Sequence, residues 1–295
     1  MSIYSQIILF LQYDKLAEGE KEIANYFLLF AAILMIVFFV VKIFYFFEMV
    51  YVEYVKKKLF FNHVYLRKSK LTSSQKLTLR KNFKFYQKLS SKHQSYFEHR
   101  VYQIINETEF IGKDIAVTEE MRVIVTATLV KLTFGLRDYN IESVERIIFY
   151  PEEFYSQTNK AYHKGEFNFG LKALVFSWKD VLHGYEIKDD NLNLAIHEFT
   201  HAIHFYYMRV RRQSTSAAMF LDTYIELTSM LDSDPKLKSK LVQSNFLRDY
   251  AFTNQFEFLS VIVETFIESP QQFKIEFPSI YGKVKTMLGF NFVGY

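Results

Sequence analysis

The longest apolar run of the sequence lies near its N-terminus. Residues 23–41 contain only two polar groups, in Asn25 and Tyr26, and an aromatic cluster follows at 43–47. A helix needs ~20 apolar residues to cross the hydrocarbon of a bilayer, and aromatic residues are typical of its two interfaces. The pattern therefore predicts one transmembrane helix at 23–47. A buried core helix and a cleaved signal peptide are the alternatives, which the lack of a polar stripe and of small residues after the run disfavour.

After this run the hydrophobic pattern changes to shorter elements of both kinds. Apolar residues spaced three and four apart predict helices, and short β-rich runs bounded by Pro or Gly predict strands. Helices are expected at 72–107, 121–136, 190–210, 216–232, 254–268 and 278–289. Strands are expected at 145–151 and 172–178, with a turn-rich hairpin at Gly165 and Gly170, and the N-cap of helix 190–210 is expected from Asp189-Asp190-Asn191. This order predicts an α+β fold, mainly helical with a small sheet, preceded by one transmembrane helix.

The distribution of charge adds an orientation to this picture. Residues 42–100 carry 14 basic and 3 acidic side chains, whereas residues 1–41 carry 2 basic and 4 acidic ones. Basic residues flank a membrane span on its cytoplasmic side, so we expect a single-pass protein of the cytoplasmic membrane whose C-terminal domain is in the cytoplasm. The expected domains are a short N-terminal segment at 1–22, the transmembrane helix at 23–47, a basic juxtamembrane linker at 48–70 and a folded domain at 71–295.

The basic region has an anionic membrane as its expected partner, because it directly follows the span. Aromatic residues at Phe83, Tyr86 and Tyr96 lie among its cations, which is also a feature of nucleic-acid-binding surfaces, but we expect no direct contact with nucleic acid. A solvated helix face is a further interpretation for the residues beyond 72. Residues 3–12 are apolar but too few to span, and are expected in the interface or against the anchor.

The absence of cysteine limits the chemistry that the chain can perform. Disulfides, thiolate metal sites and a cysteine nucleophile are excluded. A zinc ion would have to be held by His, Asp and Glu.

The sequence His197-Glu198-Phe-Thr-His201 is the main candidate for such a site. Two histidines four residues apart on a helix lie on one face, and both rings can bind one cation at ~2.0–2.1 Å. Glu198 can accept a proton from zinc-activated water as the water attacks a peptide carbonyl, and can pass that proton to the leaving amine. Because the pattern is short, a buried helix with incidental histidines is the alternative. The apolar residues 192–196 favour a preorganised site.

A catalytic zinc needs a third protein ligand and an open position. Glu226 and Glu257 follow His201 by 25 and 56 residues, and both are carboxylates in apolar stretches of expected helices. Residue chemistry alone does not choose between them, and a solvated helix face is the ordinary alternative for each.

A family resemblance makes the choice. The pattern Asn193-Leu-Ala-Ile-His197-Glu198-Phe-Thr-His201, then Tyr250 and Glu257-Phe-Leu-Ser-Val-Ile-Val-Glu264-Thr-Phe266, with Pro270 and Phe277-Pro278 in register, resembles the Mlc titration factor A family of zinc-dependent peptidases. The strand residues 148–151 and 175–178 are also similar to that family. The resemblance covers about residues 70–292, omits the anchor and implies a gluzincin-like, zincin-type metallopeptidase domain at 71–295.

The resemblance implies roles for particular residues. His197, His201 and Glu257 correspond to the ligands of one zinc ion per chain, Glu198 to the general base, and Tyr250 to a tyrosine that can hydrogen-bond the oxyanion. Glu264 lies two helical turns after Glu257, where it can orient a ligand histidine or make an ordinary helix-end or surface contact.

Some positions depart from the family pattern. Thr200 and Ser260 each replace Ala, Leu259 replaces Phe, and His204 stands where the family tends to have Asp. His204 can act beside the metal, as a spare ligand or as a plain helix residue. The strand Ala173–Phe176, within 160–177, is expected at a sheet edge, where it can hold an extended peptide or serve only as sheet structure.

The sequence thus supports three functions. The first is a membrane-anchored zinc metallopeptidase that acts on a peptide or protein. The second, also implied by the resemblance, is a membrane-tethered module that captures a transcriptional regulator, with weak or no peptidase activity. The third is a structural membrane protein with a chance motif. The sequence does not choose between exo- and endopeptidase cleavage.

Overall fold

The computed structural model describes residues 18–186, 191–293 and 295, and it divides the chain into two compact units between Val50 and Tyr51. In the first unit the described residues form one helix, α2 (Glu18–Val50). The stretch Gly19–Val55 is long and apolar enough to cross a membrane, and its apolar window is not buried within the protein as a core helix would be. The expectation for residues 3–12 lies outside the described residues.

The second unit, Tyr51–Tyr295, is mainly helical. It begins with a π-helical turn, η1 (Tyr51–Val55), and then an extended stretch without regular structure. Its helices are α3 (Ser73–Asn82), α4 (Lys84–Lys88), α5 (Ser91–Glu107), α6 (Glu119–Thr133), α7 (Trp178–Glu186), α8 (Leu194–Val210), α9 (Thr215–Ser233), α10 (Pro235–Gln243), η2 (Asp249–Phe252), α11 (Gln255–Glu268), α12 (Pro270–Glu276) and α13 (Pro278–Met287).

A small mixed sheet completes this unit. Its strands are β1 (Glu109–Gly112), β2 (Arg146–Tyr150), β5 (Gly165–Asn168) and β6 (Ala173–Ser177), in the order β1-β2-β6-β5, and β3 (Phe154–Ser156) pairs separately with β4 (Ala161–His163). The strands β1, β2 and β6 are parallel, whereas β5 is antiparallel to β6. The edge position expected for Ala173–Phe176 was wrong, because β6 lies between β2 and β5, and β5 forms the edge.

The α+β class, with a small sheet and a preceding apolar helix, is confirmed, but one long element was wrong. The helix expected over 72–107 is three helices, because Phe83 and Leu89 adopt extended backbone angles that end α3 and α4. Phe83, Phe85, Tyr86 and Leu89 are all buried. Their spacing cannot place them on one face of a straight helix.

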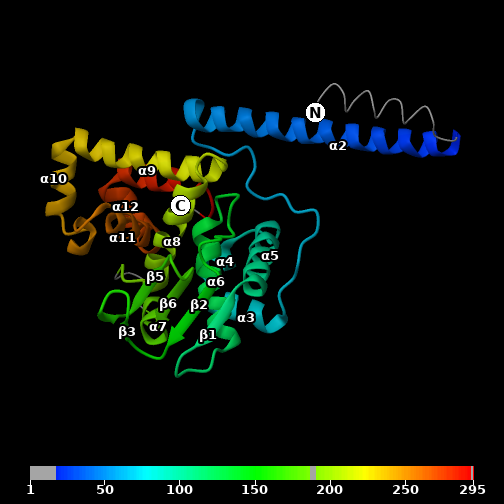
Figure 1. Ribbon diagram of the computed structural model, residues 1–295. Coiled ribbons are helices and arrows are strands. Elements are labelled where there is room, and N and C mark those ends of the chain that lie inside the picture. The colour runs from blue at the N-terminus through cyan, green and yellow to red at the C-terminus, as the bar shows by residue number, and fades with distance from the viewer. Residues whose placement is uncertain (1–17, 187–190, 294) are drawn as a thin grey trace. The chain divides into compact units, whose positions relative to one another are not determined.

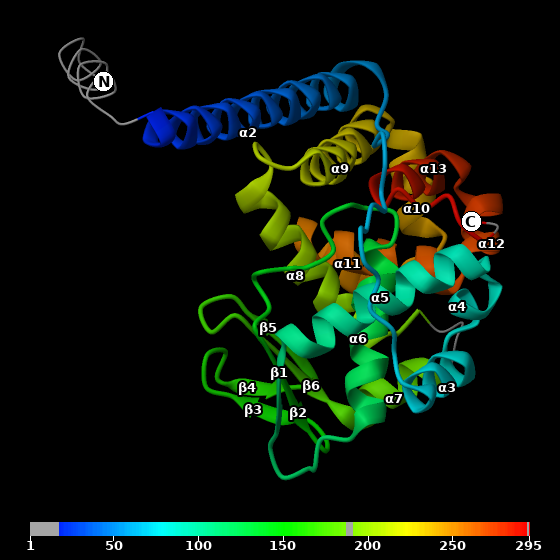
Figure 2. The same cartoon turned by 90° about the vertical axis from the view of Figure 1, so that its right-hand side faces the viewer.

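Helix α8 lies at the centre of the second unit. It packs on α6, α9 and α11 and on the strands β5 and β6, so that it separates the sheet from the C-terminal helices (Figures 1 and 2). Phe199, Ala202 and Ile203 of α8 are buried in the core. A helix held on several sides in this way keeps its remaining side chains in fixed positions, as a catalytic site requires.

Candidate metal centre

The two histidines of α8 face one point. The side chain of Asn193 caps the helix by accepting the backbone N–H of Ile196, so the expected cap at Asp189-Asp190-Asn191 was wrong by at least two residues; positions 189 and 190 lie outside the described residues. One turn into the helix, the Nε2 atoms of His197 and His201 lie 3.1 Å apart. Their rings are nearly perpendicular, with centroids 4.7 Å apart.

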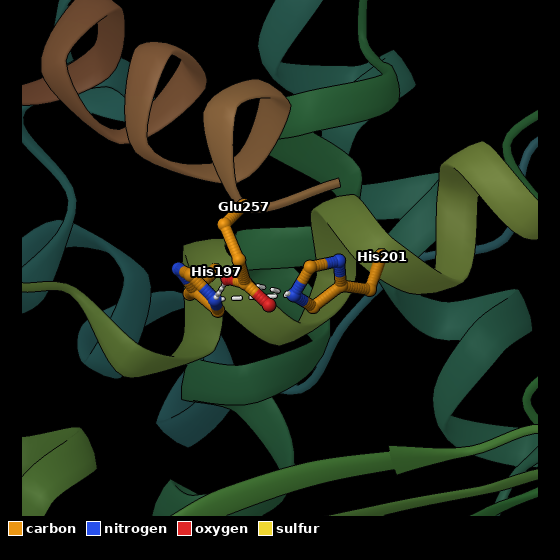
Figure 3. Close-up of side chains that lie close together, drawn as sticks. All are labelled: His197, His201 and Glu257. Atoms are coloured by element: carbon orange, nitrogen blue, oxygen red, sulfur yellow. Dashed lines mark hydrogen bonds and ion pairs between the residues drawn. The ribbon is translucent and has the colours of Figure 1, made fainter. Parts of the chain in front are cut away.

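Glu257 reaches the same point from α11. Its Oε2 atom lies 2.9 Å from Nε2 of His197 and 3.5 Å from Nε2 of His201 (Figure 3). Asn254 caps α11 directly before it, which fixes the first turn of that helix. The structure therefore brings together the three residues that the resemblance selected, and they can hold a metal ion.

The rival carboxylate, Glu226, has another role. It lies on α9 and forms an ion pair with Lys283 at 2.7 Å and a longer one with Lys57 at 3.7 Å. It does not belong to the group of His197, His201 and Glu257.

The donor set fits a tetrahedral metal ion such as zinc. Ligands at ~2.0–2.1 Å from a tetrahedral ion are about 3.3 Å from one another, and the three separations here are 3.1, 2.9 and 3.5 Å. No other hydrogen-bond partner reaches the buried Oε2 atom of Glu257 in the described residues. Two imidazoles and one carboxylate are also ordinary ligands of a catalytic zinc.

Glu264 holds the first histidine in place. Its Oε1 atom lies 2.5 Å from Nδ1 of His197, and its Oε2 atom accepts the backbone N–H of Asn193 at 3.3 Å. Arg248 donates to the same carboxylate at 2.6 Å. A carboxylate that accepts the Nδ1 proton leaves the Nε2 lone pair free for a metal. Of the two roles considered for Glu264, the geometry favours orientation of a ligand histidine.

Ser260 makes the corresponding contact with the second histidine. Its Oγ atom lies 3.3 Å from Nδ1 of His201 and donates to the backbone carbonyl of His197 at 3.3 Å. Because the hydroxyl of Ser260 donates its proton to that carbonyl, its oxygen can accept the Nδ1–H of His201. Sequence reasoning missed this contact and Arg248, since Ser260 was noted only as a replacement for Ala within the Glu257–Phe266 pattern and Arg248 lies outside that pattern.

The centre has an electrostatic preference for positive charge. Burial alone would lower the pKa of His197, but hydrogen bonds with Glu257 and Glu264 raise it to about 9. Burial would raise the pKa of Glu257, yet hydrogen bonds with the two histidines hold it well below its ordinary value. Carboxylates that favour a proton on His197 also favour a cation at its Nε2 side.

Glu198 lies between the metal ligands and the sheet. Burial raises its pKa, and the neighbouring histidines and a hydrogen bond with the backbone of Phe167 in β5 oppose that rise. Gly165, also in β5, allows this close approach: a Cβ atom there would lie 2.9 Å from Cγ of Glu198 and 2.6 Å from Cδ1 of Leu194. A carboxylate with a raised pKa at this position suits proton transfer.

A cleft of about 490 Å³ opens onto His197, Glu198 and Glu264. Tyr250, on η2, lines it and has its ring 5.9 Å from that of His197. Burial and the adjacent Glu257 raise the pKa of Tyr250, so its phenol keeps its proton. The remaining wall includes polar side chains from the sheet side, namely Glu153, His163, Lys164, Asp180 and His183.

His204 does not join the ligands. It is buried beside the rings of Phe256 and Tyr224, with centroids 5.3 and 5.7 Å away. Burial and the neighbouring His201 lower its pKa to about 4. The geometry therefore favours a neutral packing residue.

Comparison with known proteins agrees with this geometry. A family model described as glucose-regulated metallo-peptidase M90 matches residues 56–288. An uncharacterized protein of Synechocystis sp. (strain ATCC 27184 / PCC 6803 / Kazusa) is 23% identical over 218 residues, which cover 67% of this chain and 76% of that protein. The region matched by the family model contains the three candidate ligands, Glu198 and Tyr250, and begins after α2.

Proposed function

Since the chain belongs to the glucose-regulated metallopeptidase M90 family, we propose that it is a zinc-dependent peptidase anchored in the membrane by α2. The observation that carries this proposal is the triangle of ligand atoms from His197, His201 and Glu257, with the buried Glu198 beside it. The family match confirms the resemblance found in the sequence.

Each residue has a definite task in this proposal. His197, His201 and Glu257 would hold the zinc ion, which when bound supplies a Lewis acid that polarises the peptide carbonyl and activates water. Glu198 accepts the proton of the attacking water and delivers it to the amine that leaves as the C–N bond breaks. Tyr250 donates its phenolic proton in a hydrogen bond to the developing oxyanion.

The edge strand β5 offers a means of holding the substrate. Its free edge lies next to Glu198, and an extended peptide can pair with such an edge through its backbone. The substrate would then lie in the cleft with its carbonyl between the ligand triangle and Tyr250.

The location follows from α2 and the charges after it. A helix of this length and composition suits a single membrane span, and the basic residues that follow it favour a catalytic unit in the cytoplasm. We include this orientation in the proposal.

The test uses the full chain in detergent. We expect one zinc ion per chain by metal analysis, and hydrolysis of a peptide library that stops on chelation and returns with zinc. Glu198→Gln should reduce hydrolysis by about 10²–10⁴-fold while zinc is retained, whereas Glu257→Ala should lose zinc.

Equal turnover by Glu198→Gln would overturn the assignment of the base. Clean protein without stoichiometric zinc would overturn the metal centre. Zinc binding without hydrolysis of any peptide would contradict a peptidase and leave capture of a partner as the better account.

A further inference from the structure

The stretch from Lys56 to Lys70, here called the juxtamembrane segment, lies between η1 and α3. It runs along the second unit as extended chain without helix or strand after η1 (Figure 2). Apolar residues exposed to solvent are concentrated in it, although the unit has a large core in which they could be buried.

The segment is fixed to the unit by one set of its side chains and carbonyls. Asn62 donates to the carbonyl of Gly135 at 2.8 Å, and Arg100, fully buried, donates to the Tyr65 hydroxyl at 2.6 Å and to the carbonyl of Asn62 at 3.0 Å. Leu59 is buried in the core. These contacts hold the backbone, so the direction of the remaining side chains is built into the fold.

Other side chains of the segment point outward and are apolar. Leu66 is fully exposed, Val64 is 65% exposed and Phe60 is 48% exposed. Large apolar side chains that a fold holds out in solvent, close together along the chain, indicate an interaction surface.

Cations flank these apolar side chains in the sequence. Lys56, Lys58, Arg67 and Lys70 are exposed, and within the described part of the chain their side chains have no hydrogen-bond or ion-pair partner. Lys57 differs, because it pairs with Asp222 at 3.3 Å. The free cations therefore face the same solvent as Val64 and Leu66.

We propose that the juxtamembrane segment is a second membrane contact, which inserts Val64 and Leu66 into the interface of an anionic bilayer and binds lipid phosphates through its free cations. Exposed aliphatic side chains between lysines and arginines match both layers of such an interface. The segment follows α2 after only a few residues, so the bilayer is the surface nearest to it along the chain. The exposed rings of Phe60 and of the preceding Tyr54 would suit base stacking, so oligonucleotide binding is one outcome of the test, whereas the aliphatic Val64 and Leu66 favour a lipid interface.

The contact rests on the proposed anchor but not on the proposed peptidase activity. It would restrict the motion of the second unit relative to the bilayer more than a single membrane span does.

The experiment places a reporter in the full chain. Leu66→Trp, which adds to the single natural Trp178, is reconstituted into nanodiscs of anionic or neutral lipid brominated near the headgroup end of the acyl chains. The matched control is Ile275→Trp, another highly exposed aliphatic residue, on α12 at the other side of the second unit in Figure 1. We expect several-fold more quenching of the added emission at 66 than at 275 in anionic discs, and less in neutral discs.

Changing Lys56, Lys58, Arg67 and Lys70 together to Gln should reduce the quenching at position 66. Equal quenching at 66 and 275, in protein that has entered the discs, would overturn the contact while leaving the anchor and the peptidase intact. Failure of the wild-type chain to enter discs would overturn the anchor and this contact with it. Binding of an oligonucleotide with no quenching at 66 would assign the cations to nucleic acid instead.

Discussion

Three residues of α11 organise the metal centre from one helix face. Glu257 supplies a candidate ligand atom, Ser260 contacts His201 and Glu264 contacts His197. Their spacing of three and four residues places them one above the other along α11. The rings of both histidines are therefore set by a single rigid element that also provides the third ligand.

The serine contact leads to a prediction about metal affinity. Ser260→Ala leaves Nδ1 of His201 without its partner, so the ring loses its fixed orientation and zinc should bind about 10-fold more weakly. Affinity is measured by competition with a chromophoric chelator. Thr200→Ala is the matched control, because within the described residues the hydroxyl of Thr200 donates to the carbonyl of Ile196 and has no hydrogen bond with either histidine ring. Equal affinities for both variants would show that Ser260 does not position His201.

At this scale the sequence predicted the three residues that the structure groups as candidate ligands, but not all of the contacts that support them. His197, Glu198 and His201 follow from helical spacing, and Glu257 from the resemblance, since residue chemistry left Glu226 equally possible. Glu226 differs only in its tertiary partners, Lys283 and Lys57. Arg248 reaches the centre from the loop before η2, and no local pattern marks such a contact.

Among the elements, the approach of β5 to α8 has the closest connection to catalysis. Gly165 lies against Glu198, and the backbone of Phe167 contacts the same carboxylate. The strand therefore limits where the side chain of Glu198, the proposed base, can point.

The prediction at this contact is a loss of turnover without loss of metal. In Gly165→Ala the new methyl group must displace Glu198 or Leu194, and a shift of the base by about 1 Å can cost about 100-fold in kcat. Gly170→Ala is the control, since its Cβ would meet nothing closer than Oδ1 of Asn168 at 3.6 Å. Steady-state kinetics and metal analysis are compared for both. Unchanged kcat in Gly165→Ala would mean that β5 does not set the position of Glu198.

The predicted elements were most accurate where periodicity is local. Helices α6, α9 and α11 and strands β2 and β6 lie close to the expected ranges. The strand β1 was missed because it has only four residues and is defined by its pairing with β2, which is distant in the sequence. In that pairing Glu109 lies opposite Arg146. The break between α4 and α5 had a local signal, the N-cap Ser90, but helical spacing across it concealed the break.

His63 is a further contact between the juxtamembrane segment and the rest of the second unit. Its ring stacks on Tyr96 and packs against Phe134, with centroids 5.0 and 4.6 Å away. Burial, followed by the charge of Arg100, lowers the pKa of His63 from 6.5 to about 2. The neutral ring therefore fits the aromatic site, and protonation must disrupt it.

This burial predicts how stability depends on pH. Because the folded-state pKa lies below 6.5, the unfolded chain binds the extra proton between about pH 6.5 and pH 2, so stability is fully present above pH 6.5 and is lost as pH falls below it. The slope from one such group approaches about 1.4 kcal/mol per pH unit. His63→Phe keeps a ring in the site and removes the titration, so its free energy of unfolding should fall less steeply with acid by that amount.

Urea unfolding of the full chain in detergent, followed by Trp178 fluorescence, measures the difference. Tyr96→Phe, which keeps the histidine, is the control and should retain the wild-type slope. Parallel pH profiles for wild type and His63→Phe would show that folding does not lower the pKa of His63. The imidazole would then not have to be neutral for the juxtamembrane segment to stay in place.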